Sequence, residues 1–279
     1  MYSSLPERGI GRDEMTKEMN MLKKRILTFF HYNGLLRELV MRDIKVRYRR
    51  SFLGLLWTVL NPLLMMAVQA VVFSTFFKAN IVNFPVYLLV GNIVFSMNAD
   101  STSQALLSIV GNGGLIKKVY IPKYLFPLSK VMSCLVNFGF SFVALLLVML
   151  ATKAPFHAEI FLSFVPLFYL LLFSIGLSFI LSSVTVFFRD IAHLYSVFIT
   201  AWTYLTPIFY PLDILPPQLQ SFINWNPMYQ YIKYFRLLIM EGIIPAWRTN
   251  LFCFGLGLAT LLLGVYLFQR LQDRFILHI

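Results

Sequence analysis

The sequence is poor in charge, in acidic residues and in cysteine. Only 13% of its 279 residues are charged, and only two, Cys134 and Cys253, are cysteines. Soluble domains carry about 25% charged residues, so the composition excludes an ordinary water-soluble protein. The two cysteines form no Cys-x-x-Cys pair and stand within apolar runs, which gives no support to a disulfide framework or a zinc site. We expect both to be small buried apolar side chains.

Signatures of nucleotide hydrolysis and of metal catalysis are also missing. A phosphate-binding loop needs Gly-x-x-x-x-Gly-Lys followed by Ser or Thr, and the glycine-rich stretch 111–114 has neither that spacing nor the lysine. The four histidines lie far in sequence from one another and from the cysteines, and no His-Glu-x-x-His occurs. We therefore expect a chain that is not an enzyme, hydrolyses no ATP itself and binds no metal or cofactor.

Carboxylates are scarce where the chain is most apolar. Asp100, flanked by Asn98 and by Ser101, Thr102 and Ser103, is the acidic residue left at membrane depth. An ionisable side chain inside a span is a functional-site hypothesis by default. The alternative is that Asp100 occupies a hydrated or helix-broken stretch. Carriers driven by protons or ions normally show several such carboxylates, so either a partner supplies energy or the chain performs no active transport.

Apolar residues are abundant: 58% of the chain is hydrophobic, and its mean hydropathy is +0.72. A helix needs about 20 mainly apolar residues to cross the hydrocarbon layer of a membrane. Six stretches approach or exceed that length, which predicts an all-α membrane protein with six transmembrane helices. The predicted spans are 53–77, 84–109, 128–151, 160–188, 191–210 and 251–267.

The basic residues are unevenly distributed along this topology. Lys and Arg outnumber Asp and Glu by 24 to 12, which gives a net charge of +12. Six spans place both termini on one side, and that side holds nineteen of the Lys and Arg residues against five on the other. Because Lys and Arg are retained on the cytoplasmic side, both termini are predicted to be cytoplasmic. The excess charge then reflects topology and not nucleic-acid binding.

Residues 211–246 form the one long external connection of this topology. Prolines interrupt it early and Asn226-Pro227 interrupts it again, while residues 228–242 carry apolar side chains at helical spacing beside Lys233 and Arg236. The pattern predicts two short helices lying at or dipping into the outer leaflet. The alternative is an amphipathic surface hairpin that only caps the bundle.

The first fifty residues divide into a tail and a helix. Residues 1–34 are predicted to form a polar tail, and residues 35–52 an amphipathic interfacial helix that ends in the basic residues Arg47, Arg49 and Arg50. Anchoring on the anionic inner leaflet would account for this helix. The alternative is that it also docks a cytoplasmic partner. Residues 53–279 then form the transmembrane domain.

Five short motifs follow one another in register with this topology. They are Arg42-Asp43-Ile44-Lys45-Val46-Arg47-Tyr48 with Leu53-Gly54, Trp57 and Asn61-Pro62; Val186-Phe187-Phe188-Arg189-Asp190-Ile191; Thr206-Pro207-Ile208-Phe209-Tyr210; Leu212-Asp213-Ile214-Leu215-Pro216-Pro217; and Asn226-Pro227-Met228-Tyr229. Together they resemble the transmembrane subunits of type-2 ABC exporters for lipid-linked polysaccharides, the O-antigen and teichoic acid permeases. The resemblance covers residues 35–275.

The resemblance implies a partner and an assembly. Two copies of the chain would pair with two separate ATPase subunits, which bind ATP and magnesium, and would form a channel between them in the bacterial cytoplasmic (inner) membrane. Residues 111–124, the turn at 189–190 and the amphipathic helix would contact the ATPase, and helices after Leu212 would form an external gate. The coupling candidates are Lys117, Lys118, Tyr120, Pro122, Arg189 and Asp190.

The resemblance also implies a substrate, a polysaccharide linked to undecaprenyl diphosphate. An aromatic content of 16% suits stacking on sugar rings, although Trp and Tyr are enriched at membrane interfaces in any case. The alternatives are a teichoic acid permease, a small-molecule or lipid exporter permease, and a non-transporting membrane scaffold. Candidates for the substrate path are Trp57, Trp202, Tyr204, Phe209 and Tyr210, and candidates for first contact with the anionic diphosphate are Arg47, Arg49 and Arg50.

Overall fold

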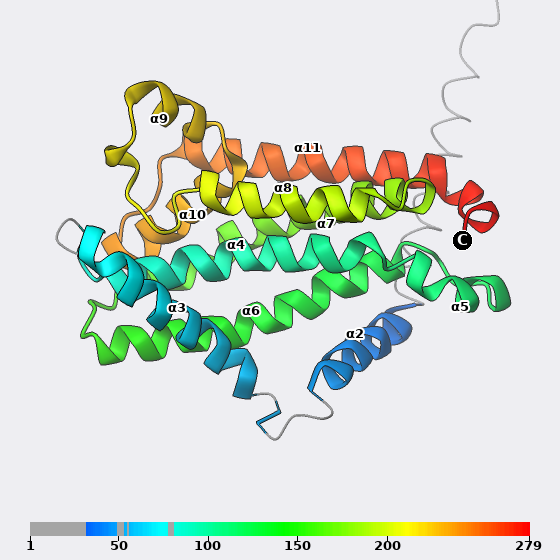
Figure 1. The fold of residues 1–279 in the computed structure, drawn as a ribbon, viewed down its shortest axis with the longest axis horizontal. Helices are drawn as coiled ribbons and strands as arrows, with labels where there is room; N and C mark the ends of the chain where they lie inside the picture. Colours follow the sequence, from blue (N-terminus) through cyan, green and yellow to red (C-terminus); the bar gives the residue numbers. More distant parts are fainter. Residues whose placement is uncertain (1–31, 49–52, 55, 78–80) are drawn as a thin grey trace, which may run out of the picture.

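The computed structural model describes residues 32–48, 53–54, 56–77 and 81–279, and every regular element within these ranges is helical. Figure 1 shows the long helices running along one axis of the molecule, with α3 crossing the others at an angle. The prediction of an all-α protein is confirmed for the described residues. The long helices are α3 (Leu56–Phe77), α4 (Phe84–Leu106), α6 (Leu125–Ala151), α7 (Phe164–Phe187), α8 (Ile191–Leu205) and α11 (Trp247–Leu271).

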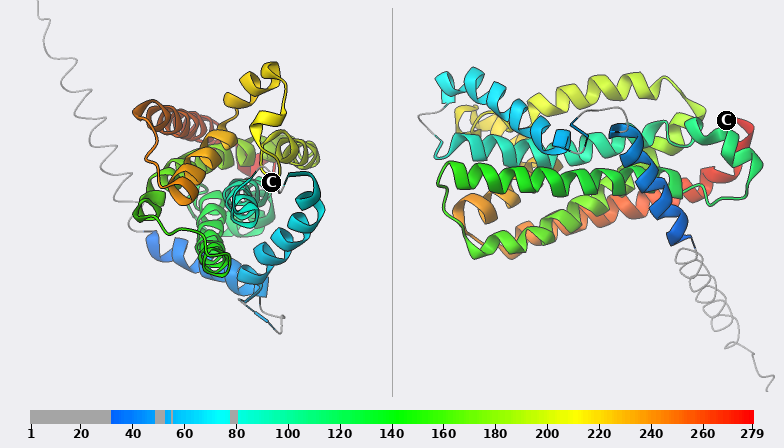
Figure 2. Two further views of the ribbon diagram at one scale, coloured as in Figure 1. Left: turned by 90° about the vertical axis from the view of Figure 1, so that its left-hand side faces the viewer. Right: turned by 90° about the horizontal axis from the view of Figure 1, so that it is seen from below.

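Helix α4 occupies the centre of the bundle, as the end-on view in Figure 2 shows. It packs against α3, α6, α7, α8 and the short helix α10 (Pro227–Arg236), and α7 packs along α11. Leu88, Leu89 and Val94 on α4 have no exposed surface. The core of the molecule is therefore built around α4.

Four helical segments are long and apolar enough to cross a membrane: Leu56–Phe73, Leu125–Ala151, Ala158–Phe187 and Trp247–Leu277. Helix α8 is apolar but has 15 residues, short of the length that a perpendicular crossing needs. Helix α4 is 23 residues long but carries several polar side chains. The six-span count is therefore supported by composition at four helices, and stays a prediction for α4 and α8.

Several predicted span ends are wrong by a few residues. Helix α3 begins at Leu56 and not at 53, α4 ends at Leu106 and not at 109, and α6 begins three residues before 128. The span predicted at 191–210 ends early, because Thr206 is extended and precedes Pro207. A residue before proline disfavours the helical conformation, so hydropathy alone overestimates this helix. A 3-10 helix, Ala158–Ser163, leads into α7, and α11 extends beyond 251–267 at both ends.

The amphipathic helix is present as α2 (Asn33–Tyr48), which begins two residues before the predicted boundary at 35. Leu36 and Leu39 are buried against a cluster of apolar side chains that includes Phe126. The Nζ of Lys130 on α6 lies 2.8 Å from Oδ2 of Asp43. Helix α2 is therefore held against α6 by apolar packing and one ion pair. The rest of the predicted tail, 1–31, and residues 49–52 lie outside the described residues.

Residues 211–246 contain the two short helices that the sequence predicts, α9 (Pro217–Asn224) and α10, followed by a π-helical turn, Leu237–Glu241. Helix α10 is not a surface element, because Tyr231, Ile232 and Phe235 are fully buried. A hairpin that only caps the bundle therefore does not describe it. In Figure 1 α9 and α10 lie at the end of the bundle opposite to α5 (Gly113–Lys118) and the C-terminus.

Candidate functional site

Aromatic side chains gather where α8 ends beside α10. Trp202, in the last turn of α8, donates from Nε1 to Oδ1 of Asn226 at 2.9 Å, and its ring meets that of Phe95 edge-on at 6.1 Å. Asn226 donates from Nδ2 to Oγ1 of Thr206 at 3.0 Å and also accepts from the backbone N–H of Met228. These bonds hold the non-helical chain after α8 against the start of α10.

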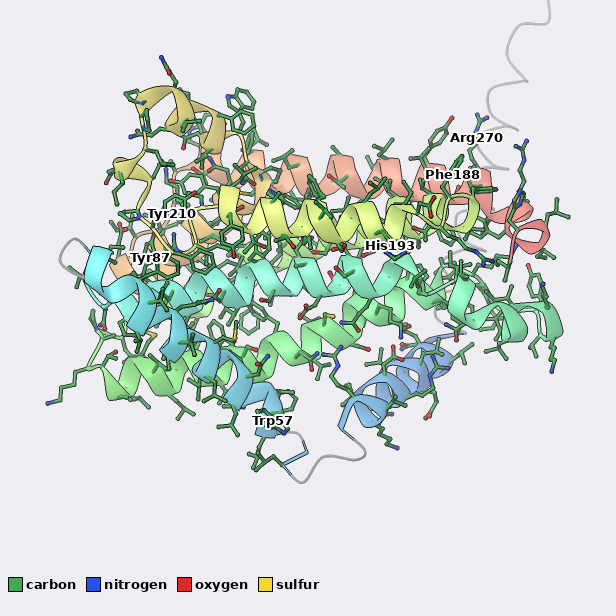
Figure 3. The ribbon with its side chains drawn as sticks, viewed as in Figure 1. Trp57, Tyr87, Phe188, His193, Tyr210 and Arg270 are labelled. Carbon is green, nitrogen blue, oxygen red and sulfur yellow. The ribbon has the colours of Figure 1, made fainter. Side chains whose placement is uncertain are left out.

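Tyr204, Phe209 and Tyr210 continue this cluster. The Tyr210 hydroxyl donates to the Tyr204 carbonyl at 2.9 Å, and the Tyr87 hydroxyl donates to the Tyr210 carbonyl at 2.9 Å. Figure 3 shows Tyr87 and Tyr210 close together at this end of the bundle. The Phe209 ring stacks on Phe73 at 5.4 Å and is buried, whereas Tyr204 is 65% exposed. Within one chain the ring of Tyr204 is exposed. The ring of Phe209 packs beside it, with ring centres 6.3 Å apart, but is itself buried and faces no open path.

Trp57 lies away from this cluster, in the first turn of α3 (Figure 3). Its side chain is 39% exposed. The structure thus brings four of the five predicted path residues together at one end of the bundle. Trp57 belongs to a different surface.

Arg236, at the end of α10, is the residue of this region that sequence reasoning missed. Its Nη1 donates to the Pro207 carbonyl at 2.8 Å, and its Nη2 donates to the carbonyls of Ile208 at 3.1 Å and Tyr87 at 3.2 Å. The guanidinium carbon also lies 3.4 Å from the centre of the Tyr87 ring. Burial lowers the pKa of Arg236 to about 10, which leaves the side chain charged at neutral pH.

The sequence placed Arg236 on the polar face of an external helix, and this is wrong: the side chain is 8% exposed. Three backbone carbonyls replace the water at Nη1 and Nη2, while the buried Nε bonds to none of the described residues. The sequence feature that could have indicated a buried arginine is the helix break at Thr206-Pro207. Where a chain leaves a helix inside a core, its backbone carbonyls need hydrogen-bond donors from elsewhere. Arg236 therefore ties α10 to the end of α8 and to α4.

The opposite end of the bundle carries α5 and the last residues of the chain. The Lys117 ammonium donates to the Ile279 carbonyl at 2.5 Å, and a Cβ on Gly113 would lie 2.0 Å from Cγ2 of Ile279. The C-terminal residue therefore packs directly on α5. Lys118 is exposed and Tyr120 is 92% exposed, so both project away from the bundle.

The turn between α7 and α8 lies at this same end, where Figure 3 labels Phe188 and Arg270. Arg189 and Asp190 are exposed there, and they make no ion pair with each other in the described part of the chain. Pro122 is half-buried between α5 and α6. The predicted coupling residues therefore share one end of the molecule.

Of the three arginines predicted to meet a lipid diphosphate, only Arg47 is described. Its Nη2 donates to Oε1 of Gln104 on α4 at 2.8 Å. Arg49 and Arg50 lie outside the described residues. Arg47 is therefore oriented toward α4 and not only toward a lipid surface.

Asp100 lies within an unbroken α4, so the helix-broken alternative is wrong. It lines a cavity of about 190 Å³ bounded by α3, α4 and α6. Its neighbours Asn98, Ser101 and Thr102 face the core and are fully buried, and Oγ of Ser174 donates to Oδ1 of Asn98 at 3.0 Å. The polar residues around Asp100 thus separate into a buried network and a cavity lining.

Both cysteines are free and buried, as the sequence predicts. Across the described ranges no three His, Cys, Asp or Glu side chains gather closely enough to hold a metal ion. The fold therefore offers aromatic, hydroxyl, carboxamide and basic groups for recognition.

Comparison with known proteins places the chain in a family. The family model for the ABC-2 type transporter matches residues 34–240. The chain is 33% identical over 218 residues to the O-antigen export system permease protein RfbA of Myxococcus xanthus, covering 77% of this chain and 84% of that protein. It is 32% identical over 239 residues to an RfbA of Klebsiella pneumoniae, covering 84% and 90%. It is 25% identical over 240 residues to the polysialic acid transport protein KpsM of Escherichia coli, covering 84% and 92%. The helical bundle, its apolar spans and these matches together show that the chain belongs to the ABC-2 type transporter family.

Proposed function

We propose that this chain is the permease subunit of an ATP-driven exporter that moves a polysaccharide linked to undecaprenyl diphosphate across the bacterial cytoplasmic membrane. The observation that carries the proposal is the likeness to O-antigen export permeases along most of both chains. The polymer is an O-antigen or a similar glycan. The weaker likeness to the polysialic acid transport protein KpsM makes polysialic acid the second candidate.

The two ends of the bundle suit two tasks. The end with α5 exposes Lys118, Tyr120, Arg189 and Asp190. A separate ATPase subunit would bind the permease at this end. ATP and magnesium belong to that subunit. The opposite end, with α9, α10 and the aromatic cluster, would form the external gate.

A second copy of the chain completes the assembly in this proposal. Helices α3 and α8 both expose large apolar side chains, among them Val68 and Val71 on α3 and Val197 and Phe198 on α8. These faces would meet lipid or the partner permease, and two permeases would join two ATPase subunits. Arg47, with Arg49 and Arg50, would meet the anionic diphosphate at the inner leaflet.

Reconstitution tests the proposal. The permease and its ATPase subunit are placed in liposomes with a lipid-linked O-antigen-type polysaccharide, and glycan that becomes accessible to an external glycosidase is measured. We expect ATP-dependent transport that is lost with a hydrolysis-defective ATPase subunit. Transport of a small amphiphile without the glycan, or no association with an ATPase subunit, would overturn it.

A further inference from the structure

The cavity between α3, α4 and α6 is lined by two facing rows of side chains. On α3 the row is Trp57, Asn61, Met65 and Gln69, and on α4 it begins with Asn92, Ser96 and Asp100, at intervals of four residues on each helix. Residues four apart share one face of a helix. Since α3 and α4 are consecutive and antiparallel, the two rows face each other along the cavity.

A side-chain hydrogen bond lies at each end of the cavity, one between α3 and α4 and the other between α2 and α4. At one end Nδ2 of Asn92 donates to Oε1 of Gln69. At the other end Nη2 of Arg47 donates to Oε1 of Gln104, which lies one turn beyond Asp100 on α4. These two contacts join the elements around the cavity while leaving its middle open.

Three polar side chains between these ends bond to none of the residues that the structure describes. Asn61, Asp100 and, from α6, Asn137 make no hydrogen bond or ion pair with any described residue, although all three line the cavity. Polar groups that serve only to hold membrane helices together bond to one another. Unpartnered carboxamide and carboxylate groups that converge from three helices are instead available to a ligand.

The chemistry of the lining selects the ligand. Among the described residues of the lining, Arg47 and Asp100 are the charged ones, and their formal charges cancel. A diphosphate is recognised by clustered Arg or Lys, and the described lining holds a single arginine beside a carboxylate. Sugar hydroxyls both donate and accept hydrogen bonds, and carboxamides offer both functions while a carboxylate accepts. Trp57 adds an aromatic face at the edge of the cavity.

We propose that the cavity between α3, α4 and α6 binds a single sugar ring of the exported glycan, with Asn61, Asp100 and Asn137 as its hydrogen-bonding groups. Its volume of about 190 Å³ is below the ~300–1,000 Å³ of pockets for drug-sized ligands, so it holds one ring and not a chain. The site rests on the proposed function. It gives Asp100 a role in binding and separates Trp57 from the aromatic cluster near Tyr210.

Photo-crosslinking tests the site directly. Met65 lines the cavity and is 51% exposed, and its replacement by benzoylphenylalanine places a photoreactive group there. Val143 on α6 is similarly exposed, at 49%, and lies two positions from Ser141, on the far side of that helix. In the permease–ATPase complex in liposomes with undecaprenyl-diphosphate-linked O-antigen-type polysaccharide, we expect glycan-positive adducts from the probe at 65 and none from the probe at 143.

Transport kinetics provide a second measurement. Asn137→Leu and Asp100→Asn keep the number and branching of the side-chain non-hydrogen atoms. Each should raise the KM for the lipid-linked glycan about tenfold while the maximal rate changes less than twofold, as expected for loss of a substrate hydrogen bond. Ser103→Ala, on an exposed face of α4 outside the cavity, should change neither. Both substitutions should also weaken crosslinking from position 65.

The outcomes separate the two proposals. If the unmodified complex transports no glycan, the proposed function and the site both fall. If it transports the glycan but the probes at 65 and 143 label it equally or not at all, the site alone is wrong. Substitutions that lower the maximal rate without changing KM would show that these residues serve the fold and would also overturn the site.

Discussion

Arg236 lies in an environment that requires a long side chain with several hydrogen-bond donors. A buried guanidinium loses its hydration and must recover it from fixed acceptors, and here the acceptors are the carbonyls of Tyr87, Pro207 and Ile208. Gly91 makes room for it, since a Cβ there would lie 2.9 Å from Nη2 of Arg236. The carbonyls of Pro207 and Ile208, which lie outside the helices, would lose this donor if the guanidinium were removed.

We predict that Arg236→Met lowers the free energy of unfolding by about 3 kcal/mol, because it removes charge-assisted hydrogen bonds and leaves buried carbonyls unpaired. Arg236→Lys should recover only part of the loss, since an ammonium cannot reproduce the fork of the guanidinium. Thermal unfolding of the purified permease measures both. Lys233→Met, one turn earlier on α10 at an exposed position, is the control and should leave the melting temperature unchanged. Equal melting temperatures for the Arg236 and Lys233 variants would contradict this role.

The contrast between Lys233 and Arg236 shows what the sequence could predict of single residues. Helical spacing correctly indicated an amphipathic helix around both. It could not assign the buried face, because α10 is apolar on more than one side and its partners lie far away in the chain, on α4 and beyond the end of α8. The burial of Cys134 and Cys253 was predictable since each stands in an apolar run.

At the scale of elements, helices α7 and α11 approach each other closely at two glycines. A Cβ on Gly176 would lie 2.4 Å from the carbonyl carbon of Thr260, and one on Gly264 would lie 2.3 Å from the carbonyl oxygen of Gly176. Backbone atoms cannot rotate away as side-chain ends do. Small residues at such crossings allow membrane helices to approach closely.

Gly176→Ala should therefore force α7 and α11 apart and lower stability by about 2–3 kcal/mol, the cost of overpacking a close contact. Gly255→Ala on the same α11 is the matched control, because a Cβ there meets nothing within 4 Å. Alanine is a better helix former than glycine, so this control should be neutral or slightly stabilising. Yield of folded protein on gel filtration and the melting temperature report both. A Gly176 variant as stable as the Gly255 variant would disprove the tight crossing.

Helix α5 lies at the proposed contact with the ATPase subunit. Lys117 bonds to the C-terminal residue, whereas Lys118 is exposed next to it. Lys118→Glu should therefore leave the permease folded and lower glycan-stimulated ATP hydrolysis by the complex several-fold, since it reverses a charge at the proposed contact with the ATPase. The control is Lys153→Glu, an exposed lysine in the loop after α6. If both variants hydrolyse ATP as the unmodified complex does, α5 is not the coupling element.

Element identities were predictable to a large extent, and their ends and pairings were not. Long apolar runs indicated α3, α6, α7 and α11 because a run of about 20 apolar residues is typical of a membrane-spanning helix. The cavity was missed although the spacing of Asn61, Gln69, Asn92 and Asp100 was visible in the sequence. A spacing of four shows that residues share a face of one helix, but the register between two helices depends on packing that the pattern does not encode.

At the scale of the whole molecule, the distribution of Lys and Arg predicts how the chain is oriented in the membrane. Nineteen of the 24 Lys and Arg residues fall on the predicted cytoplasmic side. In the fold, Tyr120 lies with α5 at one end, and Val82 lies just before α4 begins, toward the other. In the single chain Tyr120 is 92% and Val82 is 87% exposed, so a reagent in water can reach both when the permease is expressed without an ATPase subunit.

Single cysteines at these positions test the orientation. Both native cysteines are buried, so the unmodified chain should react little with a membrane-impermeant maleimide and serves as the blank. In intact spheroplasts we expect Val82→Cys to be labelled and Tyr120→Cys to be protected, with Tyr120→Cys becoming reactive once the membrane is permeabilised. Trp225→Cys, at a 73% exposed position beside α9, should behave as Val82→Cys. The reverse pattern would place α5 outside the cell, where no ATP-hydrolysing subunit could reach it, and would remove the basis for coupling at that end of the bundle.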